Sequence, residues 1–436
     1  MVKKAIIKIV CFTCVLALCA GMFSSCALIA GQALYEIMQD GGANPSPEGD
    51  QGDNSHEGDE DYQDSDKVTL PSGNFGQDNS IVVEGGDADV KHAAAKGLLS
   101  SVSIKCAVSR SASVGEVSYS SAGSGVIYKI DKKTGNALII TNYHVLYSSS
   151  AKNSSRVCDV IHVFLYGSEN QDMVIEASYV GGSMYYDIAV LYVENSEIIK
   201  SSDAQQADIG DSDKIFAGQI AIAIGNPEDY GISVTKGIIS TQSEYISMTS
   251  VDGSSYISLR VVRVDTAVNS GNSGGGLFDD RGRLIGIVNA KSAQSGVENI
   301  GYAIPVNVAR AVADNIIYYC SGGEYKGVMR AILGISVNVD SSKAHYDSES
   351  GLVYISEVIS VVEVTKGSLA DGVFREGDRL VSITLGENTA QISRQYHVID
   401  LMLDARAGDT VSFEIERGSE RTTVQFVITE ECLTEY

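Results

Sequence analysis

The sequence has no cluster of lysine and arginine residues, and basic residues are scarce relative to acidic ones. Its 436 residues include 32 Lys and Arg against 56 Asp and Glu, which gives a formal net charge of −24. Nucleic acids are bound through basic patches that neutralise phosphates, so this balance argues against a nucleic-acid partner. The acidic excess is uneven, because residues 27–90 contain 15 acidic residues and one lysine.

Cysteine and histidine are sparse as well. Eight cysteines in a chain of this length are too few and too scattered for a disulfide scaffold. No Cys-x-x-Cys spacing occurs after residue 26 and the six histidines lie far apart, which argues against zinc. We expect no metal and no other cofactor. Cys106, Cys158, Cys320 and Cys432 follow the N-terminal region, and the sequence does not choose among their pairings.

The N-terminal 26 residues have the pattern of an export signal. Three lysines precede an uncharged, largely apolar run over residues 9–34. The sequence Phe23-Ser24-Ser25-Cys26 resembles a bacterial lipobox, in which Cys26 would be lipidated, although Leu is the usual residue three positions before the cysteine. An uncleaved membrane helix is the alternative, because about 20 apolar residues span a bilayer. Both alternatives predict a membrane-anchored protein in the bacterial cell envelope, with most of the chain outside the cytoplasm.

Residues 27–90 are predicted to form an acidic, disordered linker. Within them, residues 40–66 contain almost no aliphatic side chains. Such a segment cannot bury enough apolar surface to offset the entropy lost on ordering.

A first folded domain is predicted over residues 91–320. Many short apolar runs follow one another from about residue 98, punctuated by Gly, Asn, Asp and Ser, which is typical of an antiparallel barrel or sandwich. The first run, residues 102–108, alternates with polar residues as on a half-buried strand. A helix is predicted after Pro305, where Val308, Val312 and Ile316 recur at four-residue spacing. The other predicted strands cover residues 137–140, 161–165, 188–193, 220–224, 256–264 and 284–288.

Three segments of this domain together indicate nucleophilic catalysis. Ser273 is flanked by glycines in Gly271-Asn272-Ser273-Gly274-Gly275, a turn whose backbone N–H groups can converge on an oxyanion. A serine nucleophile needs a base and the base needs an orienting carboxylate. His144 follows one predicted strand and Asp187 begins another, so both would be fixed at the edge of the core.

The same glycines also satisfy G-x-S-x-G, the nucleophile elbow of α/β-hydrolases. That motif requires a helix after the serine and a chain order of serine, acid and histidine. Here a turn and a strand follow Ser273, and the downstream histidines lie in another region. The esterase interpretation therefore fails, and phosphate binding fails because no helix begins there.

With these residues in place, the chain resembles the HtrA/DegP family of trypsin-like serine proteases with C-terminal PDZ domains. The resemblance covers about residues 98–430 in collinear order. It implies a mainly β fold, a trypsin-like double β-barrel followed by a PDZ domain. It also implies His144 as base, Asp187 as orienting carboxylate and Ser273 as nucleophile. Besides the three catalytic segments, the matching residues are 123–126, 223–227, 235–240, 264–277 and 301–305.

The resemblance also assigns the oxyanion hole and the substrate pocket. The backbone N–H groups of Gly271 and Ser273 would form the oxyanion hole. Ala267, six residues before the nucleophile, would lie at the base of the primary pocket, and its lack of charge predicts cleavage after small or medium aliphatic residues. Two residues depart from the family pattern: Ser270 and Gly276 stand where proline is frequent, in what we expect to be the loop that orders around the oxyanion hole.

The second region, residues 326–431, resembles a PDZ domain. The run Ile332-Leu333-Gly334-Ile335 looks like the loop that binds a peptide carboxylate, and the helix predicted over residues 396–405 would form the other wall of the groove. An extended peptide would then add a strand to the sheet edge. The alternative is a small β-rich domain with no ligand.

The sequence therefore predicts a membrane-tethered serine endopeptidase that cleaves unfolded or damaged proteins and recognises peptide C-termini. A homotrimer is implied by the resemblance alone. The competing hypothesis is a non-catalytic peptide-binding or chaperone protein that retains the protease fold, against which the intact His-Asp-Ser set argues. A solute-binding lipoprotein would share the N-terminal pattern but would not need this set.

Overall fold

A computed structural model of the chain describes residues 90–108, 119–168, 173–227, 231–289, 300–320 and 327–436. The chain divides into two compact units, Met1–Gln63 and Asp64–Tyr436, and all described residues belong to the second. The expected signal and the acidic linker up to residue 89 lie outside the described residues, as does the segment 321–326 between the two predicted domains.

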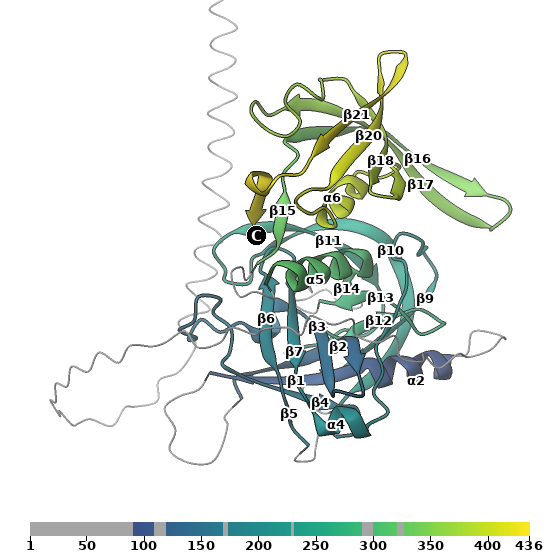
Figure 1. Cartoon of the computed structure of the whole chain (residues 1–436). Helices are drawn as coiled ribbons and strands as arrows, with labels where there is room; N and C mark the ends of the chain where they lie inside the picture. Colours follow the sequence, from purple (N-terminus) through teal and green to yellow (C-terminus); the bar gives the residue numbers. More distant parts are fainter. Residues whose placement is uncertain (1–89, 109–118, 169–172, 228–230, 290–299, 321–326) are drawn as a thin grey trace, which may run out of the picture. The chain divides into compact units, whose positions relative to one another are not determined.

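The described chain is mainly β, and its first sheet contains seven strands in the order β5-β4-β1-β2-β3-β7-β6 (Figure 1). The helix α2 (Val90–Ser100) precedes this sheet, and the short helices α3 (Tyr143–Leu146) and α4 (Glu197–Ser201) follow β3 and β7. Its strands are β1 (Ser101–Ala107), β2 (Ser121–Asp131), β3 (Asn136–Thr141), β4 (Val160–Leu165), β5 (Ile175–Glu176), β6 (Ser178–Ser183) and β7 (Ile188–Val193).

The strand predicted from the alternation near residue 102 is present, but it is not half-buried. It is β1, which pairs with β2 on one side and β4 on the other, and the polar side chains of Ser101 and Ser103 are buried as well. Ser103 accepts a hydrogen bond from Asn226 Nδ2 at 2.6 Å, which satisfies its hydroxyl inside the protein. The sequence pattern could not show this, because Asn226 comes from a different sheet.

A second seven-stranded sheet closes on itself. Its order is β12-β9-β10-β11-β14-β13-β8, and an additional pairing of β12 with β13 completes a barrel. Buried aliphatic residues of this sheet and its neighbour form the core, as the apolar runs of the sequence require. The strands are β8 (Asp208–Ile209), β9 (Ile220–Gly225), β10 (Ser233–Thr249), β11 (Tyr256–Val264), β12 (Gly276–Phe278), β13 (Arg283–Val288) and β14 (Gly301–Pro305).

The helix predicted after Pro305 is α5 (Val306–Cys320), and it connects the parts of the fold (Figure 1). Val308, Val312 and Ile316 are all buried, which confirms the four-residue periodicity. The helix packs against β6 and β7 of the first sheet and β13 of the second. It also contacts α6 of the C-terminal region, so it lies where the three parts meet.

The C-terminal region, residues 327–436, contains a six-stranded sheet and one α-helix. The sheet follows the path β16-β17-β18-β20-β21 with β19 paired to β18, and β15 pairs with β22 in a separate ladder. The elements are β15 (Met329–Ala331), β16 (Ile335–Asp347), β17 (Leu352–Val364), β18 (Arg379–Leu385), β19 (Asn388–Gln391), α6 (Tyr396–Leu403), β20 (Thr410–Arg417), β21 (Glu420–Val427), the 3₁₀ turn η3 (Glu430–Cys432) and β22 (Leu433–Glu435).

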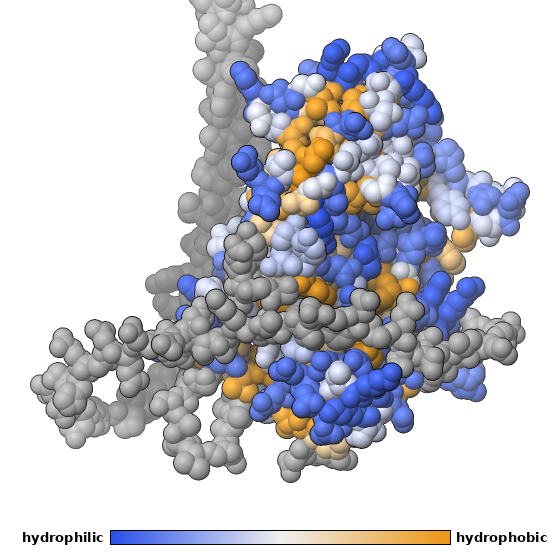
Figure 2. Space-filling model, viewed as in Figure 1, coloured by the Kyte–Doolittle hydropathy of each residue, from blue (hydrophilic) through white to orange (hydrophobic). Residues whose placement is uncertain are grey.

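Hydrophilic side chains cover most of the described surface seen in Figure 2, with hydrophobic ones gathered in smaller patches. Among the residues that the structure describes, no helix is both long and apolar enough to cross a membrane.

Candidate active site

His144 is held at the end of a buried strand. β3 lies between β2 and β7. Asn142 follows it in extended backbone conformation and occupies the N-cap position of α3. His144 is the second residue of α3, and its side chain is 18% exposed. The strand thus fixes the backbone while one edge of the imidazole stays open to a substrate.

Asp187 contacts His144 directly. Its carboxylate is fully buried, and Oδ2 lies 2.7 Å from His144 Nδ1. Oδ1 accepts the backbone N–H of His144 at 2.9 Å. Because an ionised carboxylate only accepts hydrogen bonds, Nδ1 carries the imidazole proton and Nε2 remains the acceptor. That tautomer is the one a general base requires.

The turn that carries Ser273 lies against the end of β2. Gly271 and Gly274 have φ angles of +94° and +83°, which favour glycine. A Cβ atom on Gly274 would lie 2.2 Å from the Ser124 carbonyl oxygen and 3.1 Å from the Asn142 nitrogen, so no larger residue fits there. The turn that carries Ser273 and the segment before His144 are therefore packed backbone to backbone. Ser273 itself is 5% exposed.

Ser124, in β2, connects the first sheet, which forms the first barrel of the fold, to the second barrel at this point. Its N–H donates to the Ser273 carbonyl at 2.8 Å and its Oγ donates to the Gly271 carbonyl at 2.7 Å. The same Oγ accepts the backbone N–H of Asn226, and the Ser124 carbonyl accepts Thr141 Oγ1–H at 2.7 Å. One residue of β2 thus binds both ends of the turn that bears the serine, through its backbone at Ser273 and its side chain at Gly271.

Two asparagines of the site were not found from the sequence. Asn289, directly after β13, donates its Nδ2–H to Asp187 Oδ2 at 2.9 Å, and Asn142 donates its Nδ2–H to the Asp187 carbonyl at 2.8 Å. Asp187 has a φ of +50°, an uncommon conformation for a residue with a side chain, and these contacts hold it there. Nothing in a single sequence pairs residues 102 positions apart.

Gly276 does not belong to the loop around the oxyanion hole, contrary to the expectation from the sequence. It is the first residue of β12, is buried, and pairs with Ile224 and Ile287. A Cβ at this position would lie 2.3 Å from the ring of Phe278, which explains the glycine by packing. Ser270 is exposed and does precede the turn. Ala267 is exposed too, and its carbonyl accepts a hydrogen bond from Thr235 Oγ1 at 3.1 Å.

The run Ile332-Leu333-Gly334-Ile335 connects β15 to β16, the edge strand of its sheet. The carbonyls of Leu333 and Gly334 accept the N–H groups of Ala370 and Thr365, at 3.0 and 2.8 Å. Gly334 has a φ of +80°, and a Cβ there would collide with Ser368 at 2.2 Å.

This loop lines a cavity of about 290 Å³. Apolar side chains of α6, including Val398, Ile399 and Met402, form another wall. The barrels contribute further lining residues, among them Tyr186, Tyr245 and Arg260. The cavity is therefore shared between the C-terminal region and the barrels.

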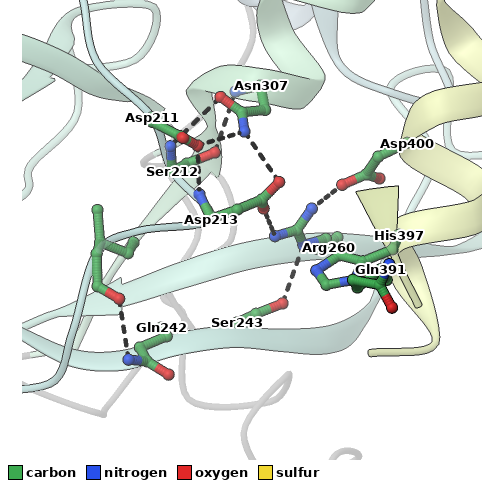
Figure 3. Close-up of polar contacts among 11 residues, drawn as sticks. Asp211, Ser212, Asp213, Gln242, Ser243, Arg260, Asn307, Gln391, His397 and Asp400 are labelled. Atoms are coloured by element: carbon green, nitrogen blue, oxygen red, sulfur yellow. Dashed lines mark hydrogen bonds and ion pairs between the residues drawn. The ribbon is translucent and has the colours of Figure 1, made fainter. Parts of the chain in front are cut away.

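Arg260 is central to the contact between α6 and the barrels (Figure 3). Its guanidinium is 4% exposed, bonds Asp213 at 3.1 Å and also bonds Asp400 of α6. It lies over the ring of Tyr396, with 3.4 Å between Cζ and the ring centroid. A second pair joins Arg310 of α5 to Asp404 at 2.8 Å. One arginine of β11 and one of α5 thus bind carboxylates of α6 and of its C-cap residue.

Comparisons with known proteins agree with this architecture. The model of the trypsin-like peptidase domain family matches residues 123–287. The chain is 31% identical to the serine protease Do-like HtrA of Bacillus subtilis, over 72% of this chain and 65% of that protein. It is 34% identical to the periplasmic pH-dependent serine endoprotease DegQ of Escherichia coli, over 60% of this chain and 50% of that protein. The chain thus spans less than two thirds of the length of either relative.

The chain is therefore similar to trypsin-like serine proteases of the HtrA type. The structure of the HtrA-type protease AlgW with tripeptide superposes with a TM-score of 0.50 at 24% identity, covering 80% of this chain and 98% of that one. This likeness concerns the fold. It confirms the predicted fold class, a mainly β protein with a trypsin-like double barrel followed by a PDZ-like region.

Proposed function

We propose that this chain is a serine endopeptidase of the HtrA family in which His144, Asp187 and Ser273 form the catalytic triad. The observation that carries the proposal is the 2.7 Å contact between His144 Nδ1 and the fully buried Asp187 carboxylate, beside the glycine turn that holds Ser273. A buried carboxylate that orients an imidazole next to such a turn matches the requirements of acyl transfer.

The residues perform the reaction in the following order. His144 Nε2 accepts the proton of Ser273 Oγ as that oxygen attacks the peptide carbonyl. The N–H groups of Gly271 and Ser273 stabilise the oxyanion of the tetrahedral intermediate. His144 then protonates the leaving amine, and a water molecule repeats the sequence on the acyl-enzyme. Asp187 keeps the imidazole in the right tautomer and stabilises the imidazolium.

We further propose that the C-terminal region is a PDZ domain that binds the C-termini of peptides in the cavity beside β16. Because the carbonyls of Leu333 and Gly334 bond to the segment behind the loop, the opposite side of those peptide groups is available to a carboxylate. The apolar α6 side chains that line the cavity favour an apolar last residue.

The natural substrates under this proposal are unfolded or damaged proteins in the bacterial cell envelope. The relative from Escherichia coli is described as periplasmic, and the N-terminal pattern of this chain favours export and anchoring. Cys26 is the proposed lipidation site, and a homotrimer is the proposed assembly. Labelling with a fatty-acid analogue tests the anchor: Cys26→Ala should lose the label, and equal labelling of both forms would place the anchor elsewhere.

Fluorophosphonate labelling of the exported protein tests the catalytic assignment. The probe should modify Ser273, and Ser273→Ala should lower casein hydrolysis by about 10⁶-fold. The replacement Asp187→Asn should lower it by about 10⁴-fold. An unlabelled wild type that binds casein without cutting it would favour the non-catalytic chaperone. Casein hydrolysis by Ser273→Ala at a near-normal rate would overturn the assignment.

A further inference from the structure

The thiols of Cys106 and Cys158 lie together in the core of the first barrel. Cys106 belongs to β1 and is fully buried, and Cys158 is 2% exposed in the loop after α3. The N–H of Ser120 donates to the Cys106 carbonyl at 2.8 Å, and its Oγ lies 3.8 Å from Cys158 Sγ. Both side chains belong to the same buried hydrophobic cluster, and both residues contact Ser120. The fold thus brings together two cysteines far apart in the sequence.

The other two cysteines of the folded region have different surroundings. Cys320, at the end of α5, belongs to a separate hydrophobic cluster, and its thiol donates to the Gly327 carbonyl at 3.4 Å. Cys432 is partly exposed, with its sulfur 3.0 Å from Thr429 Oγ1. The structure therefore favours one pairing among those that the sequence left open.

We propose that Cys106 and Cys158 form a disulfide bond in the mature protein, which attaches the loop behind the catalytic histidine to β1. The proposal rests on the export that is part of the proposed function, because disulfides persist in oxidising compartments. Because both sulfurs are buried in the folded protein, the oxidation has to occur during folding, before the core closes. Burial would then protect the finished bond from reductants.

The chemistry needs a disulfide oxidant, either an exported thiol–disulfide oxidoreductase or, in the test tube, oxidised glutathione. In the folded pair, the hydrogen bond from Cys106 lowers the pKa of Cys158 to about 7 and raises the pKa of Cys106, so Cys158 is the better attacking thiolate as the two sulfurs approach each other. It displaces one glutathione thiolate and forms a mixed disulfide. The deprotonated Cys106 sulfur then attacks Cys158 Sγ and expels the second glutathione. The two cysteines lose two electrons and two protons, and the oxidant becomes two thiols.

The bond would act on the segment that carries His144. The N–H of Cys158 donates to the Leu146 carbonyl at the end of α3, at 2.9 Å, and a β-bridge joins Tyr147 to Val157. A covalent link from Cys158 to β1 would therefore restrain α3 at its C-terminal end. It would also reduce the conformational entropy of the unfolded chain, because it closes a loop of about 50 residues.

Peptide mapping of the full chain, denatured and then refolded in detergent with oxidised glutathione, tests the bond. Trypsin cuts after Lys105, Arg110 and Arg156, so the two cysteines fall on separate peptides. After denaturation and alkylation, we expect these peptides linked, with a mass two hydrogens below their sum. Two alkylated peptides, or either cysteine linked to Cys320 or Cys432, would overturn the proposal.

Thermal unfolding gives a second readout. The wild type and Cys320→Ser should unfold roughly 5 °C higher after oxidation than with reduced thiols. Cys158→Ser should show no such difference, and an equal difference in all three proteins would also contradict the proposal. Neither readout depends on the protein's own proteolytic activity. An absent disulfide would therefore not affect the Ser273 assignment, and an unlabelled Ser273 would not affect the disulfide.

Discussion

The hydrogen bonds made by the Asp187 side chain could not be predicted from its position in the sequence. Its carboxylate accepts three hydrogen bonds, from the His144 ring, the His144 backbone and Asn289. Full burial makes each of these bonds stronger and makes a missing partner costly. The geometry of the histidine therefore depends on residues from three separate strand ends.

Replacing Asn289 tests this dependence. Asn289→Ala should lower kcat by about 10- to 100-fold with little change in KM, because the Asp187 carboxylate loses a donor and no substrate contact is removed. Asn289→Asp should be worse, since it places a second carboxylate against the first. Steady-state kinetics on a short reporter peptide measure both variants. Wild-type kcat in Asn289→Ala would show that Asp187 needs no such support.

Cleavage specificity provides the second residue-scale prediction. Ala267 brings no charge to the proposed primary pocket, so cuts should follow Val, Ala, Ile or Leu. A substrate lysine or arginine would find no carboxylate to pair with at this position. Ala267→Asp should move the cuts toward Lys and Arg. Mass spectrometry of products from an unfolded substrate gives the distribution, and a wild-type majority after Lys or Arg would rule out the pocket assignment.

At the scale of elements, the ion pair between the turn before β18 and the end of β20 stabilises the C-terminal region. Asp378 is buried and binds Arg417 through both oxygens, at 2.7 Å each. Burial by itself would raise the pKa of Asp378, but the Arg417 guanidinium and the Arg375 N–H outweigh it and hold the pKa below its usual value. The charged form is thus favoured in the folded state.

Acid should therefore weaken this region in a definite pH range. A carboxyl group with a depressed folded-state pKa contributes stability above its unfolded pKa, near 4, and loses it as the pH falls through the folded value. The melting temperature of the wild type should drop between about pH 4 and pH 2 more than that of Asp378→Asn, which should be less stable at pH 7. Glu387→Gln, in an exposed turn, is the control and should follow the wild type. Parallel curves for wild type and Asp378→Asn would contradict the linkage.

At the scale of the whole molecule, the proposed peptide groove and the barrels share a wall. Tyr186, the residue before Asp187, lines the cavity and accepts a hydrogen bond from Arg330 at 2.8 Å. The helix α6, on the other side of the cavity, is bound through Asp400 to Arg260 of the barrels. A peptide that enters the cavity would therefore contact residues connected to Asp187, the proposed catalytic carboxylate, which provides a physical basis for coupling.

A peptide with a free, apolar C-terminus should raise cleavage of a short reporter by about 5- to 150-fold. Its amidated twin, which lacks the carboxylate, should have no effect. Asp400→Asn removes one partner of the buried Arg260 and should reduce this fold-stimulation toward one, which means no stimulation. The surface control Glu387→Gln should be stimulated as strongly as the wild type. Identical reporter rates with free peptide, amidated peptide and no peptide would refute the coupling and leave the triad unaffected.

The sequence alone determined the elements and the candidate chemistry. Apolar runs and turn residues are local signals, so the strands and α5 could be predicted, and His144, Asp187 and Ser273 could be proposed from their motifs. Only the tertiary structure decided that Asn289 supports Asp187, that Ser103 is buried against Asn226, that Gly276 belongs to a strand and that Cys106 faces Cys158. Most of these are contacts between residues many positions apart, and such contacts depend on how complete sheets pack, which no local pattern records.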